Sequence, residues 1–157
     1  MPHKGWTHDS VTDLGAEDAV ERHTCEMCAK EGIRYVHHLT HPDGHSADVG
    51  CECAVKLCVD YEAAPRAEKQ IKDRARQRAS FTSTRGWKLR ANGNHVRNKK
   101  GWSLTVFRDK NNPGRWKWVA HKDYTPRSAT EWSPTSYASA EDAKRALFDE
   151  YATDLYG

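Results

Sequence analysis

The chain of 157 residues contains no run of about 18 apolar residues, the length that a membrane-spanning helix needs. Its N-terminal stretch, MPHKGWTHDSVTDLG, also lacks the apolar segment of a secretory signal peptide. Hydrophobic residues make up only 37% of the chain, charged residues make up 30%, and the mean hydropathy is −0.94. We therefore expect a cytoplasmic protein without a membrane partner, built from small modules rather than around one large apolar core.

The sequence also lacks the even, dispersed set of cysteines that is typical of a disulfide framework. Its five cysteines all lie within residues 25–58, as a CxxC pair, a CxC pair and one further residue: Cys25 and Cys28, Cys51 and Cys53, and Cys58. In a reducing compartment, clustered cysteines more often bind a metal than form disulfides. The clustering therefore predicts a metal site.

A structural Zn²⁺ takes four Cys or His ligands in a tetrahedron. Side chains two residues apart on an extended strand point the same way, so Cys51 and Cys53 are expected to face one ion. The predicted ligands are Cys25, Cys28, Cys51 and Cys53. His37 and Cys58 are further candidates, either as ligands or as residues that contact a ligand.

The segments CEMC, IRYVHHL, ADVGCECA and AVKLCVDY follow one another as a knuckle, two strands and a helix. This order resembles treble-clef zinc fingers. The CxxC, the strand ending in His, the HP turn and the GCxCA return also resemble a module of small uncharacterised bacterial and phage proteins. The resemblance covers residues 25–61 and implies metal binding.

Other interpretations of this region stay open. An iron–sulfur cluster is also held by four thiolates, and the cysteines can be free thiols. A catalytic zinc needs only three ligands and a water, although no glutamate stands in an HxE or HExxH pattern. The general-base and ligand types of a metal-dependent nuclease are concentrated in HHLTHPDGH, at His37, His38, His41, His45 and Asp43.

Charge is unevenly distributed along the chain. Residues 65–122 carry a net charge of +14, whereas the remainder carries −11, and the sum is only +3. Lys and Arg neutralise phosphates, and aromatic rings stack on unpaired bases. Four tryptophans interleave with the basic residues: Trp87, Trp102, Trp116 and Trp118. The predicted nucleic-acid-binding residues are Lys69, Lys72, Arg76, Arg85, Lys88, Arg90, Arg97, Lys99, Lys100, Arg108, Lys110, Arg115 and Lys117.

The hydrophobic pattern predicts an α+β protein in four parts. These are a leader over 1–22 with a short helix at AEDAVERH, a treble-clef-like zinc-binding module over 23–61, a basic linker over 62–85 and a sheet-and-helix domain over 86–157. The linker contains a helix over 62–80, and HVRNKKGW is expected to be a loop. The last domain is expected to be a three-stranded antiparallel sheet packed on a C-terminal helix with Ser139 as its N-cap.

The alternation of side chains predicts which residues form the core of that last domain. The inward residues are Trp102, Leu104, Val106, Trp116, Trp118 and Ala120 on the strands, and Ala143, Leu147, Phe148, Tyr151 and Leu155 on the helix. Trp87 and Phe107 are expected to be exposed.

The order of helix, three strands and helix from residue 65 onward resembles double-stranded-RNA-binding domains, although Glu141 and Asp142 stand where that family places basic residues. It also resembles the N-terminal DNA-binding domains of some integrases, which implies contact through the sheet. The first hypothesis for function is a non-enzymatic zinc-binding protein that binds nucleic acid, with DNA and RNA both open. The alternatives are an adaptor that binds a protein partner and, less favoured, a metal-dependent nuclease.

Overall fold

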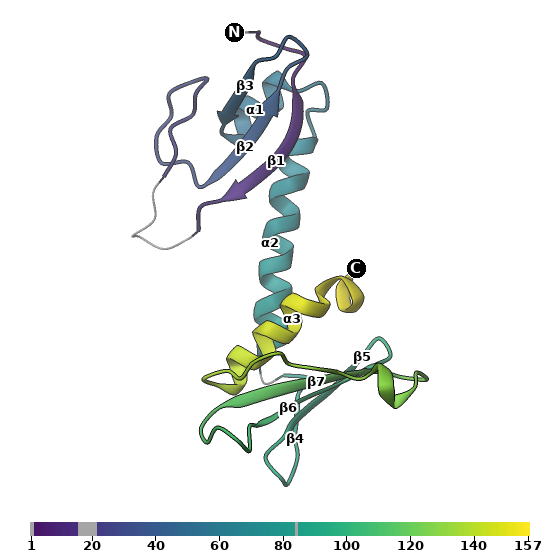
Figure 1. Cartoon of the computed structure of the whole chain (residues 1–157). Helices are drawn as coiled ribbons and strands as arrows, with labels where there is room; N and C mark the ends of the chain where they lie inside the picture. Colours follow the sequence, from purple (N-terminus) through teal and green to yellow (C-terminus); the bar gives the residue numbers. More distant parts are fainter. Residues whose placement is uncertain (1, 16–21, 84) are drawn as a thin grey trace. The chain divides into compact units, whose positions relative to one another are not determined.

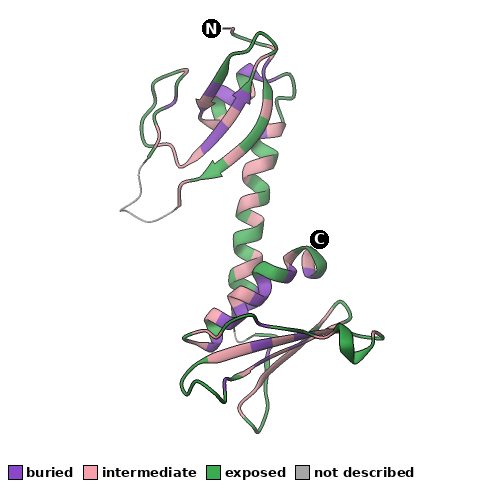
Figure 2. Ribbon diagram, viewed as in Figure 1, coloured by how far each residue is buried: buried purple, intermediate pink, exposed green. Residues whose placement is uncertain are grey.

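The computed structural model describes residues 2–15, 22–83 and 85–157, and it confirms an α+β protein. The chain divides into two compact units, Met1–Arg74 and Ala75–Gly157, each with its own antiparallel sheet and its own buried core (Figures 1 and 2). Among the described residues, no helix combines the length and the apolar character needed to cross a membrane.

The first unit contains a three-stranded sheet in the order β1 (Thr7–Asp13), β2 (Tyr35–Thr40) and β3 (Ser46–Val49). A tight turn with Gly44 at φ 96° joins β2 to β3. Leu39, Ala47 and Val49 are buried on one face of this sheet, together with Ala54 and Leu57 of helix α1 (Cys51–Leu57). The layer of α1 against β2 and β3 therefore forms the core of the unit.

The N-terminal segment differs from the predicted leader. Residues 7–13 form β1, which pairs with the whole length of β2, and Trp6 before it is fully buried. The indole N–H of Trp6 donates to the carbonyl of Pro2 at 2.9 Å. The polar sequence THDSVTD gives no hydrophobic pattern from which this strand could be predicted. An edge strand with one face in solvent needs few apolar residues. The short helix predicted at AEDAVERH begins with residues 16–21, which lie outside the described part of the chain.

The CxC pair lies on a helix, so the prediction of an extended strand through Cys51 and Cys53 was wrong. The first helical hydrogen bond runs from the backbone N–H of Ala54 to the carbonyl of Gly50 at 3.0 Å, and α1 therefore starts at Cys51. Residues two apart on an α-helix project about 200° apart around its axis. Cys51 and Cys53 consequently do not share a side.

Helix α2 (Ala63–Thr82) matches the predicted helix over 62–80 to within two residues at each end. It has Pro65 in its first turn, where proline costs no backbone hydrogen bond. The boundary between the two units falls inside it, after Arg74. Ala64 belongs to the core of the first unit and Phe81 to the core of the second.

The second unit has five strands instead of the predicted three. They are β4 (Lys88–Leu89), β5 (His95–Lys99), β6 (Trp102–Arg108), β7 (Trp116–Lys122) and β8 (Glu131–Trp132), and they pair in sequence order, all antiparallel. A short 3₁₀ helix, Arg127–Ala129, precedes β8. Strand β4 lies within WKLRANG, a short alternating segment that indicates a strand. Strand β8 is only two residues long and gives no periodic pattern in the sequence.

The segment HVRNKKGW forms β5 and a tight hairpin turn rather than the predicted loop. Lys100 and Gly101 have φ angles of 48° and 77°. A two-residue hairpin turn of type I′ needs positive φ at both central residues. Lysine is uncommon at such a position, which is why the sequence gives no turn signal there.

Helix α3 (Ala140–Tyr156) covers one face of this sheet, as Figure 1 shows. The hydroxyl of Ser139 accepts from the backbone N–H of Asp142 at 3.1 Å, which confirms the predicted N-cap. The predicted core is buried or packed against buried residues throughout: Leu104, Val106, Trp118, Ala120, Ala143, Leu147, Phe148, Tyr151 and Leu155 are buried, and Trp102 and Trp116 lie beside them.

Trp87 is buried, so the prediction that it is exposed was wrong. Its indole N–H donates to the carbonyl of Phe81 at 2.6 Å, and its ring meets that of Phe81 edge-on. Phe107 lies on the sheet face opposite Val106, as predicted, and is half-buried there.

Lys144 is a fully buried lysine in this core. Among the described residues its Nζ has no hydrogen-bond partner, and it lies 5.1 Å from the centroid of the Trp87 ring. Burial lowers the pKa of Lys144. An unpaired buried charge costs more than this cation–π contact returns.

The substitution Lys144→Met is therefore expected to raise the free energy of unfolding at pH 7 by about 1 kcal/mol, because it keeps the apolar stem and removes the charge. The gain should shrink as the pH rises from the lowered pKa toward about 10.4, since above that value the unfolded lysine is neutral as well. Urea unfolding at several pH values measures both effects. Arg145→Met, on the half-buried neighbour whose charge is paired with Asp142, should show no such gain, and a destabilised Lys144→Met would contradict the expectation.

Candidate metal centre and nucleic-acid interface

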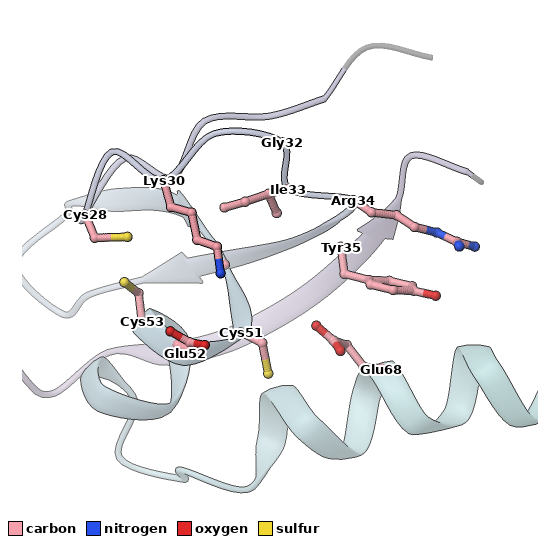
Figure 3. A pocket seen from close by; sticks show the side chains of 11 residues that line it. Cys28, Lys30, Gly32, Ile33, Arg34, Tyr35, Cys51, Glu52, Cys53 and Glu68 are labelled. Carbon is pink, nitrogen blue, oxygen red and sulfur yellow. The ribbon is translucent and has the colours of Figure 1, made fainter. Parts of the chain in front are cut away.

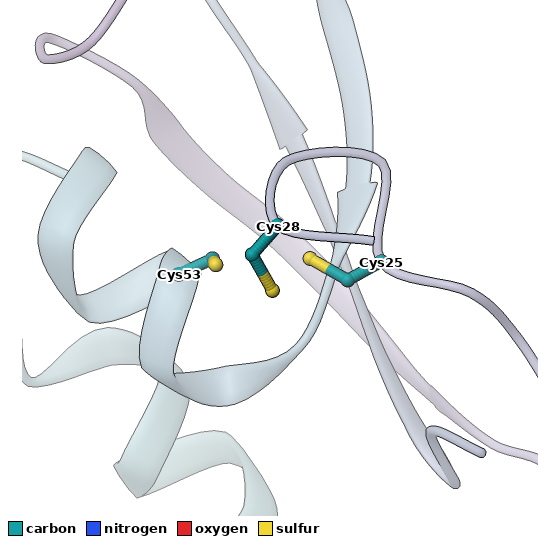
Figure 4. A group of neighbouring side chains, drawn as sticks. All are labelled: Cys25, Cys28 and Cys53. Carbon is teal, nitrogen blue, oxygen red and sulfur yellow. The ribbon is translucent and has the colours of Figure 1, made fainter. Parts of the chain in front are cut away.

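Three cysteines of the first unit point at one another (Figure 4). The sulfur atoms of Cys25, Cys28 and Cys53 all lie within 4.8 Å of one another. Zn–S bonds are about 2.3 Å long, so sulfurs at this separation can share one ion. Cys25 and Cys28 come from the turn before β2, and Cys53 comes from the first turn of α1.

The turn is shaped so that backbone donors surround the Cys25 sulfur. The N–H of Ala29 donates to the Cys25 carbonyl at 2.9 Å, and Ala29 takes a φ of 60° to close the knuckle. Burial acts to raise the pKa of Cys25, but the backbone N–H groups of Cys28, Gly50 and Met27 outweigh it and lower the pKa to about 7. These donors favour a thiolate, the form that binds metal.

Cys53 is buried, as Cys25 is, whereas Cys28 is exposed. Burial, followed by hydrogen bonds with Cys28 and Cys25, raises the pKa of Cys53 to about 12. Three thiols brought so close cannot all ionise without a cation between them. Three sulfur donors, with backbone N–H groups that stabilise the thiolate of Cys25, fit a soft or borderline metal ion.

Cys51, the fourth predicted ligand, lies in a different group. Its sulfur, a ring nitrogen of His37 and a carboxylate oxygen of Glu68 all lie within 4.8 Å of one another. A pocket of about 230 Å³ opens beside both groups, lined by Cys28 and Cys53 on one side and by Cys51 and Glu68 on the other (Figure 3). Burial, then the Glu68 carboxylate, raises the pKa of Cys51 to about 11.

His37 is fully buried, and both of its ring nitrogens are engaged. Nε2 lies 2.8 Å from Oε1 of Glu68, and Nδ1 lies 2.9 Å from Nε2 of His8 on β1. A carboxylate only accepts, so in this arrangement His37 Nε2 donates to Glu68 and His37 Nδ1 accepts from His8. Burial, then the neighbouring His37, lowers the pKa of His8, which keeps that ring neutral. No sequence signal singled out His8 or Glu68.

The other histidines of the predicted nuclease set do not join His37. His38 points to the opposite face of β2, where it contacts Asp48 at 2.6 Å, because neighbours on a strand face opposite ways. His41 and His45 both lie 2.8 Å from the Asp43 carboxylate in the β2–β3 turn. The five residues of the predicted nuclease set therefore lie in three places: His37 on one face of β2, His38 on the other face, and the rest in the β2–β3 turn.

The first unit also contains a third group of donor side chains and one cysteine that belongs to no group. His23, Glu26 and Asp48 form a third cluster, half-buried or exposed, of the kind common on surfaces without a metal. Cys58 ends α1, is buried in the apolar core, and belongs to none of the donor groups found among the described residues.

The predicted nucleic-acid-binding residues occupy different surroundings. Lys69 and Lys72 form i,i+4 ion pairs on α2 with Asp73 and Glu68. Several basic groups in the second unit are held by the protein itself: Arg97 over Phe81, Lys99 over Tyr156, Arg108 over Trp116, and Arg115 on Ser136. Arg76, Arg85, Arg90, Lys100 and Lys110 lie on α2 or in turns and are exposed, and Lys88 and Lys117 lie on strands.

The face of the five-stranded sheet opposite α3 carries a row of side chains across every strand. Paired residues share a face, and the register aligns Lys88, Val96, Thr105, Val119 and Trp132. Lys117 and Phe107 form the next pair along, and the Phe107 ring meets that of Trp132 edge-on at 6.0 Å. We call this surface the open face.

The sequence analysis did not identify the open face as one surface. Two of its residues, Lys88 and Lys117, were however among the predicted nucleic-acid-binding residues. Trp132 is 63% exposed, and sequence reasoning did not place it on this face because β8 is only two residues long. His121 also lies on this face, paired with Ser103.

The comparisons with known proteins add no assignment. No family model matches the chain, and no curated protein or solved structure matches it.

The thiol environments predict an order of alkylation. In the metal-free full-length chain at pH 7, iodoacetamide should modify exposed Cys28 first, and Cys51 and Cys53 last, because their raised pKa values leave almost no thiolate. Mass spectrometry of peptides at increasing times measures the order. Chain unfolded in urea should lose the differences, and fast modification of Cys53 in the folded chain would contradict this description of the site.

Proposed function

We propose that this chain is a non-enzymatic zinc-binding protein that binds nucleic acid through its second unit. The zinc is held by the first unit, on Cys25, Cys28 and Cys53, and its role is structural. The nucleic acid, DNA or RNA, lies on the open face.

The convergence of three sulfurs supports the zinc part of the proposal. The order of knuckle, β2–β3 hairpin and α1 also supports a treble-clef-like module, with one ligand supplied by the helix. An ion here would join the N-terminal knuckle to α1, two elements that share only a small apolar core. Structural zinc sites in modules of this size contribute about 10–16 kcal/mol to folding.

Cys53→Ser is expected to lower the zinc bound per chain by one equivalent and to lower the melting temperature of the first unit. Cys58→Ser is the matched control, because it removes a buried thiol at the other end of the same helix, and this thiol takes no part in the cluster. Metal analysis and thermal unfolding of the purified chain measure both. Zinc content unchanged by Cys53→Ser would sink this assignment, and iron with visible absorbance in its place would favour the iron–sulfur alternative.

The open face is the observation that carries the nucleic-acid part. It presents lysine, histidine and two aromatic rings on a sheet whose other face is already covered by α3. Small residues such as Ser103 and Thr105 between them leave the rings accessible. Aromatic rings stack on unpaired bases while the ammonium groups pair with phosphates. The high positive charge of residues 65–122 favours such a polyanionic ligand.

Two substitutions separate stacking from charge. Trp132→Ala should weaken binding of a fluorescent single-stranded oligonucleotide by about 1–3 kcal/mol with an unchanged salt dependence. Lys117→Gln should reduce the slope of log K against log salt by about 0.7. Anisotropy titrations at several salt concentrations measure both, with DNA and RNA oligomers and a duplex of the same sequence.

The controls for these substitutions carry the same chemical changes away from the open face. Tyr124→Ala removes a fully exposed ring in the turn after β7, and Lys122→Gln removes a charge from the other face. Both should bind as the parent chain does. Equal losses from the controls would contradict the open face as the interface. No binding of any oligomer at moderate salt would favour the adaptor, and a metal-dependent cleavage product would favour the nuclease.

A further inference from the structure

We propose that His37, Cys51 and Glu68 form a second metal site, distinct from the three-cysteine site. Each ligand comes from a different element, β2, α1 and α2, and all three belong to the first unit. Their donor atoms lie within 4.8 Å of one another. An imidazole, a thiolate and a carboxylate together suit a borderline divalent ion, with Zn²⁺ the expected one.

The geometry of α1 separates the two sites. Cys53 turns toward Cys25 and Cys28, whereas Cys51 turns toward Glu68, as Figures 3 and 4 show. Because residues two apart on a helix project about 200° apart, the two cysteines cannot face one ion while α1 keeps its first turn. The CxC pair thus supplies one ligand to each of two ions.

Hydrogen bonds hold the His37 ring in one orientation, with Nε2 directed toward Glu68. Its ring is fully buried and fixed at both nitrogens, so only a small movement of the Glu68 carboxylate is needed for an ion to replace the hydrogen bond at Nε2. His37 then carries its proton on Nδ1, and His8 changes to the tautomer with its proton on Nδ1, so that the Nε2 of His8 accepts from the Nδ1–H of His37. Metal-bound histidines commonly donate their other N–H in this way, which fixes the tautomer. His8 is the positioning residue of the site.

The pocket supplies the remaining coordination position. Cys51 and Glu68 line this pocket, and so do the side chains of Lys30 and Tyr35. An ion held by three protein ligands keeps one position open to this pocket, where water or a small anion can bind. This inference does not depend on nucleic-acid binding, and it is separable from the three-cysteine site by the experiment below.

The test measures metal stoichiometry of the full-length chain by equilibrium dialysis at a fixed free Zn²⁺ concentration. Cys51→Ser and Cys53→Ser are each expected to lose one equivalent, and the double variant is expected to lose two. Glu68→Gln, nearly isosteric, is expected to lose the same single equivalent as Cys51→Ser. Glu52→Gln is its matched control, because Glu52 lines the same pocket but belongs to neither donor group.

Cobalt substitution adds a readout that a loss of folding would not imitate. Three cobalt–sulfur bonds belong to the first site and one to the second. Glu68→Gln should therefore remove about a quarter of the near-ultraviolet charge-transfer absorbance and leave the remainder. His8→Phe should weaken the second site about 10- to 100-fold without altering the first, whereas His45→Phe, in the exposed turn, should have no effect.

The competing outcome is a single ion shared by four cysteines. In that case Cys51→Ser, Cys53→Ser and the double variant would all lose the same one equivalent, which overturns the proposal while leaving a zinc site in place. A full metal complement in Glu68→Gln also overturns it. If Cys53→Ser alone retained every equivalent, the three-cysteine site would fail and the second site would stand on its own result.

Discussion

The hydrogen bond that starts α1, from the N–H of Ala54 to the carbonyl of Gly50, is the constraint on which the chemistry of the first unit depends. An extended backbone at this point would direct both cysteines of the CxC pair to one side. The helix instead directs Cys53 to a group of three sulfurs and Cys51 to a mixed group with His37 and Glu68. The local backbone conformation at this point therefore decides which donor side chains lie together.

The two groups also differ in how their charge is balanced. The Cys25 sulfur is stabilised as a thiolate mainly by backbone amides, together with a hydrogen bond from the Cys28 side chain, and none of these groups is a charged side chain. His37 and Glu68, by contrast, are tied to His8 and Lys72 by side-chain hydrogen bonds. The first group is therefore stabilised mainly by backbone donors, and the second by other side chains.

This difference explains what could be predicted from the sequence. The α+β class and the buried stripe of α3 follow from periodicity, which is a local property. The helix at 63–82 follows from another local property, the helix propensity of its residues. Cys25, Cys28 and Cys53 were found because thiols in a CxxC and CxC pattern have few other uses in a reducing compartment. Glu68 and His8 were not, since an isolated Glu on a charged helix and a His in a polar strand carry no signal until the fold brings them to His37.

The same limit applies to the second unit. Alternation in β6 and β7 predicted which side chains face α3, and thereby which face is left open. It gave no sign of β5, whose sequence mixes basic and polar residues, or of β8, which is too short for a period. Trp132 reaches the open face through pairing of β8 with β7, a contact that only the tertiary structure specifies.

The hairpin turn at Lys100 and Gly101 has a consequence for how this sequence can vary. Strand pairing has a period of two, so the length of a two-residue turn sets which side of β5 meets which side of β6. An inserted residue there would exchange the partners of every side chain on one strand, and Val96 and Asn98 would trade places with Arg97 and Lys99. Surface loops usually tolerate insertions. Here one inserted residue, in a turn that faces solvent, would move the side chains of β5 to the opposite face of the sheet.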